Sequence, residues 1–126
     1  MFVFVDQWRA QALGHMGDPN VKTPNLDGLA SEGVVFANAY STNPVCSPCR
    51  SSIITGRWPH TNGVIQNGVL LPDEEVSIAE VLHDRGYQTG YIGKWHLDGR
   101  GKGVPGQKGH SAPGNYVPLG WRRQGF

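Results

Sequence analysis

The chain has 126 residues, with 11 Lys and Arg against 10 Asp and Glu and a formal net charge of +1. Its length is that of one small domain, and its balanced charge gives no broad attraction for nucleic acid or anionic membranes. Because of this charge balance, we expect no nucleic-acid partner. No apolar run approaches the ~20 residues needed to cross a bilayer, so we also expect no membrane span.

The chain opens on five apolar residues, Met1 to Val5, followed by Asp6 and Gln7. The run is too short for a signal peptide and lacks a basic flank, which leaves localisation open. Aromatic and β-branched residues without polar alternation predict a buried strand over 2–5. Asp6 and Gln7 would then lie at the carboxyl end of that strand, where ligands collect in open α/β sheets, although such residues also end strands in ordinary turns.

A short helix and a second strand are predicted next. Thr23 and Pro24 have the form of an N-cap followed by proline at the first helical position, and apolar residues recur at helical spacing as far as Gly33. Residues 34–40 are then rich in apolar and aromatic side chains and predict a strand.

Another helix is predicted to start at Ser47, as N-cap, and Pro48, and to end at Gly56. Cys46 would lie just before its N-terminus. Residues 57–72 are rich in Gly, Asn and Pro, so we expect an irregular loop there.

The most secure helix signal is the capping box of Ser77 and Glu80, with a stop expected at Gly86. Residues 87–92 predict a third strand, which delivers polar residues at its end. The Gly-rich segment 98–120 is expected to form a long loop.

This order of elements predicts an α/β layer fold. Three strands are fewer than a sheet normally has, and buried strands without neighbours leave backbone groups unpaired. We therefore expect the C-terminal remainder of the domain to be missing, and truncation at the start stays open because the chain begins directly in a predicted strand.

The strongest chemical feature is the run Cys46-Ser47-Pro48-Cys49-Arg50. An anion near Cys46 would meet the positive end of the predicted helix and the guanidinium of Arg50 about one turn along. Cys-x-x-Cys by itself also fits a thiol-redox pair, half of a zinc site, or no function.

The longer segment from Pro44 to Arg57 resembles the signature of the type I sulfatases, in which Cys-x-Pro-x-Arg directs oxidation of the cysteine to formylglycine. Residues 86–96 resemble the second signature of that family, and residues 23–33 are similar to its first helix. The resemblance runs from about residue 2 to about 97. It implies an alkaline-phosphatase-like α/β fold, a mixed sheet flanked by helices, with residues 1–126 as the N-terminal part of a single sulfatase catalytic domain.

The resemblance also implies roles for individual residues. Cys46 would become formylglycine, whose hydrated aldehyde is the nucleophile: one hydroxyl attacks sulfur and the other later expels sulfate. Arg50 would hold that group. Lys94 would bind sulfate oxygens, and His96 would contact the geminal diol or the sulfate.

A divalent metal, calcium first and magnesium second, is implied at Asp6, Gln7 and the modified Cys46. Asn67 resembles a polar, substrate-binding position in members that begin Asp-Gln. In the family, further metal ligands come from later in the chain, so the 126 residues alone are expected to be inactive.

The implied activity is hydrolysis of a sulfate monoester on a small molecule or carbohydrate, after maturation by a formylglycine-generating enzyme. Because an Asp-Gln start also occurs in related phosphonate and phosphodiester hydrolases, that substrate class is one alternative. A non-enzymatic or thiol-redox module based on Cys46 and Cys49 is another.

Overall fold

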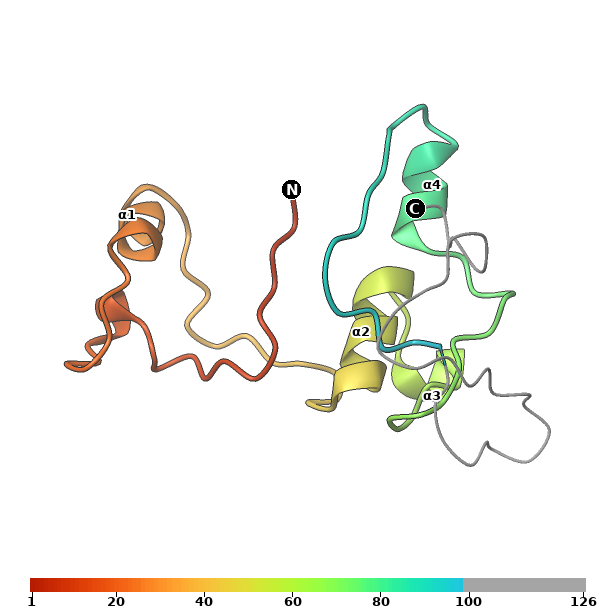
Figure 1. Ribbon diagram of the computed structural model, residues 1–126, viewed down its shortest axis with the longest axis horizontal. Helices are drawn as coiled ribbons and strands as arrows, with labels where there is room; N and C mark the ends of the chain where they lie inside the picture. Colours follow the sequence, from red (N-terminus) through yellow and green to blue (C-terminus); the bar gives the residue numbers. More distant parts are fainter. Residues whose placement is uncertain (99–126) are drawn as a thin grey trace. The chain divides into compact units, whose positions relative to one another are not determined.

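The computed structural model describes residues 1–98, so the predicted loop over 98–120 lies outside the described residues except for Asp98. The chain divides into two compact units, Met1–Tyr40 and a second unit that begins at Ser41. Figure 1 traces both. None of the described helices combines the length and the apolar character that a bilayer crossing requires.

The first unit contains a short 3-10 helix, η1 (Gly14–Met16), and the helix α1 (Pro24–Glu32). The prediction of α1 is confirmed, with proline in its first turn and Gly33 directly after its end. Thr23 precedes the helix, but its side chain does not cap it.

Instead, Thr23 joins a polar network around Asp27. The Thr23 hydroxyl accepts a hydrogen bond from the Gly14 amide at 2.8 Å and donates one to Asp27 Oδ1 at 2.9 Å. The same carboxylate oxygen accepts from the His15 amide at 2.8 Å. This network fixes η1 to the first turn of α1. Both helices are too short to be stable by propensity alone, so such contacts stabilise them.

The second unit contains α2 (Cys46–Thr55), α3 (Pro59–Asn62) and α4 (Ile78–His83). The prediction that Ser47 caps α2 is wrong, because Val45 is the N-cap and Cys46 is already the first helical residue. The prediction of an irregular loop over 57–72 is wrong in part, since α3 forms within it. Proline at the first position of α3 supplies a backbone angle suited to a helical turn.

The capping box of α4 is confirmed. The Ser77 hydroxyl accepts from the Glu80 amide at 3.1 Å, and the Glu80 carboxylate accepts from the Ser77 amide at 2.6 Å. The helix ends at His83, earlier than predicted. Gly86 follows with φ of 84°, and its amide donates to the His83 carbonyl at 2.9 Å, so it closes the turn after the helix.

The three predicted strands, over 2–5, 34–40 and 87–92, are absent from the described part of the chain. Within residues 1–98 the β-structure is an isolated antiparallel bridge between Leu70 and Asp98. A strand requires a ladder of hydrogen bonds to a neighbouring strand, and no such ladder is assigned to these three segments within residues 1–98. Most of their apolar side chains lie exposed instead, for example Phe36 at 80% and Ile92 at 102%.

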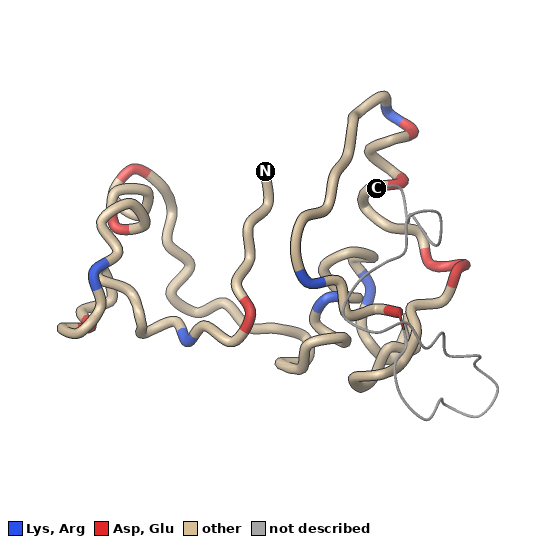
Figure 2. The backbone as a smooth tube through the Cα atoms, viewed as in Figure 1, with Lys and Arg blue, Asp and Glu red and all other residues tan. Residues whose placement is uncertain are grey.

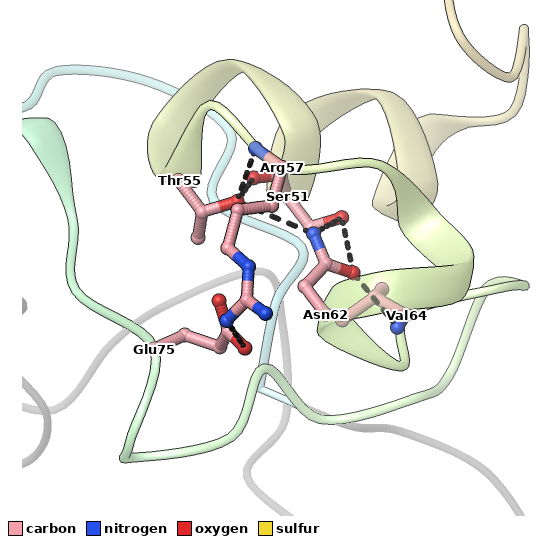
Figure 3. Close-up of polar contacts among 6 residues, drawn as sticks. All are labelled: Ser51, Thr55, Arg57, Asn62, Val64 and Glu75. Atoms are coloured by element: carbon pink, nitrogen blue, oxygen red, sulfur yellow. Dashed lines mark hydrogen bonds and ion pairs between the residues drawn. The ribbon is translucent and has the colours of Figure 1, made fainter.

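A buried asparagine organises the contact between α2 and α3, as Figure 3 shows. The Asn62 side-chain amide donates to the hydroxyls of Ser51 at 3.1 Å and Thr55 at 3.3 Å, and its carbonyl oxygen accepts from the Val64 amide at 3.0 Å. Because Asn62 is 1% exposed, these bonds meet the requirement that buried polar groups be paired.

In the second unit, acidic positions lie mainly in α4 and the chain before it, whereas basic positions gather beside α2, as Figure 2 shows. One of them, Arg57, forms an ion pair with Glu75 at 2.7 Å; the two side chains are 50% and 9% exposed. The pair therefore fastens the chain leading to α4 beside the end of α2.

We predict that Ser77→Ala lowers the free energy of unfolding by about 1 kcal/mol, the usual worth of an N-cap hydroxyl. Chemical denaturation of the full-length protein would measure it. Glu80→Gln is the matched control, because the amide oxygen can still accept from the Ser77 backbone. Equal stability of Ser77→Ala and wild type would show that the capping box contributes nothing.

The Asp27 network should respond to pH. Desolvation by itself raises the pKa of Asp27, but hydrogen bonds from the His15 amide, the Thr23 hydroxyl and the His15 ring together lower it below its ordinary value of 3.8. A lowered folded-state pKa stabilises the fold above the ordinary value, and that contribution is lost as pH falls through the lowered pKa.

We therefore expect the His15 amide to lose protection from hydrogen exchange as the solution is acidified below pH 3.8. An NMR pH titration would measure this. Asp27→Asn should remove the dependence, whereas Glu32→Gln at the end of α1 should leave it intact. A His15 amide that is equally protected across this range would contradict the role given to Asp27.

Candidate functional site

The start of α2 and the segment 94–97 lie against each other in the second unit. The Lys94 ammonium nitrogen is 3.5 Å from the Cys46 sulfur. The Ser47 hydroxyl donates to the His96 carbonyl at 2.7 Å. Two motifs almost fifty residues apart in sequence are thus brought into direct contact.

The position of the segment 94–97 follows from burial of its alternate residues. Trp95 and Leu97 are 5% and 0% exposed and belong to the core of the unit. Lys94, which precedes Trp95, and His96, which lies between Trp95 and Leu97, are half-buried. The apolar pair therefore anchors the segment and places Lys94 and His96 beside α2. The core residues are Ile54, Val64, Val69, Leu71, Trp95 and Leu97.

The backbone of this segment is unusual at two positions. Gly93 has φ of 116°, and His96 has φ of 59°. A left-handed conformation costs a residue with a side chain roughly 1–2 kcal/mol. The bond from the buried Ser47 hydroxyl to the His96 carbonyl helps to hold this conformation.

Arg50 is buried, with 5% of its surface exposed. Its Nη1 atom donates to the Tyr91 hydroxyl at 3.1 Å and to the Lys94 carbonyl at 2.5 Å. The Tyr91 hydroxyl donates to the same carbonyl. The guanidinium on α2 is thereby joined to the main chain of the residue whose ammonium lies next to Cys46.

Asn67 contacts the site through the backbone of α2. Its side-chain oxygen accepts from the Ser47 amide at 2.9 Å. The N-cap residue Val45 has no side chain able to cap the helix, so the loop residue satisfies one of the amides that a helix start leaves unpaired. The described contact of Asn67 is therefore with the helix terminus.

Both cysteines are free thiols and both are half-buried. Cys46 is the first residue of α2, and the Cys49 amide donates to the Val45 carbonyl at 2.9 Å within its first turn. The thiol of Cys46 thus lies at the positive end of the helix and beside the Lys94 ammonium, an environment that favours bound anions.

Asp6 and Gln7 belong to the first unit, where they form an exposed turn after residues 1–5. Gln7 has φ of 58°, a left-handed conformation. A carboxylate and an amide oxygen suit a hard divalent cation such as calcium or magnesium, although such ions take six or more ligands. Among residues 1–98, no three His, Cys, Asp or Glu side chains come together as a metal cluster.

The structure therefore brings together five of the seven predicted site residues, namely Cys46, Arg50, Asn67, Lys94 and His96. Two residues that join them, Ser47 and Tyr91, were not predicted in this role. Serine before proline at a helix start also fits an N-cap, and a tyrosine in an apolar run also fits a strand, so residue types alone gave no signal for either.

Comparison with known proteins identifies the family. The model of the Sulfatase family matches residues 1–116. The chain belongs to the sulfatase family. This sulfatase chain is 48% identical, over all 126 of its residues, to an ulvan-active sulfatase of Formosa agariphila, and it covers 22% of that protein. It is 43% identical over 104 residues to human arylsulfatase A, which is 77% of this chain and 20% of the relative.

A solved structure shows the same relationship. The crystal structure of a Bacteroides fragilis protein assigned as a sulfatase superposes with a TM-score of 0.71 and 47% identity, over 77% of this chain and 23% of that one. The sulfatase chain thus spans about one fifth of the length of the curated relatives that it matches. These relatives do not favour a thiol-redox module.

The bond between Ser47 and His96 gives a test of the site's framework. We predict that Ser47→Ala lowers the free energy of unfolding by about 1–3 kcal/mol, because it removes a buried hydroxyl that donates to the His96 carbonyl. Ser52→Ala, later in α2, is the control, since the Ser52 hydroxyl contacts only an exposed threonine in the described bonds. Chemical denaturation of the full-length protein would compare them. Equal losses for the two variants would contradict a special role for Ser47.

Proposed function

We propose that the protein carrying this chain hydrolyses a sulfate monoester, with Cys46 as the residue converted to formylglycine. The observation that carries the proposal is the placement of the Lys94 ammonium 3.5 Å from the Cys46 sulfur, at the start of a helix in a member of the sulfatase family. When hydrated, formylglycine supplies a hydroxyl nucleophile on the side chain of residue 46.

The cationic residues have complementary parts in this proposal. The Lys94 ammonium attracts the oxygens of a sulfate group that reaches residue 46, and its attraction grows as negative charge develops on them. Arg50 fixes the Lys94 main chain, because its Nη1 atom donates to the Lys94 carbonyl at 2.5 Å. Its own charge adds to the positive field at the start of α2.

His96 is proposed to contact the sulfate or the hydrated side chain of residue 46. Its main chain is held to α2 by Ser47, which limits how far the ring can move. Asn67 is proposed as a substrate-binding residue. Its bond to the Ser47 amide supports this by fixing it beside the residue that carries the nucleophile.

We further propose that Asp6 and Gln7, with the modified residue 46, provide oxygen ligands to a divalent cation, calcium first and magnesium second. When bound, the cation would neutralise negative charge on the sulfate group. The ligand chemistry of Asp6 and Gln7 supports the assignment, and further ligands are expected from other parts of the full-length protein.

Membership of the sulfatase family also supports proposals about fold, maturation and substrate. We propose that residues 1–126 form the N-terminal part of a single catalytic domain with the alkaline-phosphatase-like mixed sheet, and that a formylglycine-generating enzyme matures it. Relatives are named for ulvan and for N-acetylglucosamine and N-acetylgalactosamine sulfates, which supports a sulfated carbohydrate as substrate. The Asp6-Gln7 pair supports phosphonates or phosphodiesters as the second candidate class.

Mass spectrometry of the full-length protein, produced together with a formylglycine-generating enzyme, gives the first test. The peptide that contains Cys46 should lose about 18 Da, whereas a disulfide between Cys46 and Cys49 would lose about 2 Da. Cys49→Ser should keep the conversion, because the Cys-x-Pro-x-Arg residues remain intact. An unmodified thiol at residue 46 would contradict the proposal.

Turnover by the converted protein gives the second readout. Hydrolysis of an aryl sulfate should exceed that of an aryl phosphonate, and removal of divalent cations with a chelator should lower it. Cys46→Ala is the inactive control. Faster turnover of the phosphonate would replace the sulfatase assignment by the second candidate class.

A further inference from the structure

We propose that Tyr91 is a positioning residue, whose hydroxyl sets Arg50 and Lys94 in the arrangement that receives the oxyanion next to residue 46. The inference deepens the proposed function and rests on it. It concerns a residue to which the sequence patterns gave no chemical role.

Three hydrogen bonds with shared partners join Arg50, Tyr91 and Lys94. Arg50 Nη1 donates to the Tyr91 hydroxyl at 3.1 Å and to the Lys94 carbonyl at 2.5 Å, and the Tyr91 hydroxyl donates to the same carbonyl. The hydroxyl acts as acceptor and donor at once. It therefore fixes both the direction of the guanidinium and the position of the Lys94 main chain.

The tyrosine ring is itself fixed by the core. Its centroid lies 5.0 Å from that of Trp95, at an interplanar angle of 88°, the edge-to-face geometry that aromatic pairs prefer. Trp95 is 5% exposed and belongs to the core cluster, against which Tyr91 packs. The hydroxyl is thus carried by a rigid part of the unit.

The Tyr91 hydroxyl influences the surroundings of residue 46 through Lys94. The Lys94 ammonium stands 3.5 Å from the Cys46 sulfur, and its place depends on a main chain held by Tyr91 and Arg50. Loss of the hydroxyl removes one of the two described donors to that carbonyl. The ammonium then becomes less well placed, so an oxyanion binds less tightly in substrate and in product alike.

The test is Tyr91→Phe in the full-length, converted protein, with Tyr87→Phe as the matched control. Both variants lose only a hydroxyl, but Tyr87 is 62% exposed and outside the site. We expect Tyr91→Phe to raise the KM for an aryl sulfate and the inhibition constant of inorganic sulfate by roughly 10-fold, the size expected for a hydrogen bond to a charged group. Tyr87→Phe should change neither value.

Two further measurements separate positioning from a structural role. The formylglycine content and the unfolding midpoint of Tyr91→Phe should stay close to those of wild type. A variant that merely folds less completely would lose kcat while its KM and inhibition constant stayed unchanged, and that result would overturn the proposal, as would wild-type values throughout.

A wild-type protein without turnover of any sulfate ester would reject the proposed function. Tyr91 would still be tested in that case, because calorimetric titration with inorganic sulfate compares wild type and Tyr91→Phe directly. Should Tyr91→Phe fail to fold, 3-fluorotyrosine at residue 91 keeps the ring and hydroxyl but makes the oxygen a weaker acceptor from Arg50 and a stronger donor to the Lys94 carbonyl. An unchanged sulfate affinity in that protein would overturn the inference.

Discussion

The attachment of the segment 94–97 to the first turns of α2 is the constraint on which the rest of the site depends. Two main-chain carbonyls, those of Lys94 and His96, accept hydrogen bonds from the Arg50 and Ser47 side chains. The core fixes the same segment from its other side through Trp95. Because these contacts involve backbone atoms, they fix the segment while the Lys94 side chain extends to Cys46.

The helices could be predicted because their signals are local. Proline in the first turn and glycine after the end marked α1, and the reciprocal bonds of Ser77 and Glu80 marked α4. The start of α2 was predicted two residues late. The Ser47 hydroxyl donates to a distant carbonyl, a use that no local pattern reveals.

The strands could not be predicted in the same way, because a strand is defined by its neighbour. The apolar run at Phe2 to Val5 predicted a buried strand, yet Phe2 is 73% exposed and no strand is assigned to this segment within residues 1–98. Family resemblance named Cys46, Arg50, Lys94 and His96, and the structure places these four residues near one another. It did not reveal that Tyr91 lies between Arg50 and Lys94, since that contact depends on the packing of one ring against Trp95.

The burial of the residues that flank Cys46 bears on whether residue 46 can be modified before or after α2 folds. Ser47 and Pro48 are fully buried in the folded unit, and Arg50 is nearly so. A modifying enzyme that recognises these residues as a linear peptide would find them accessible only while α2 is still unformed. Under the proposed function, conversion of Cys46 would therefore have to come before this helix folds, because its flanking residues are buried afterwards.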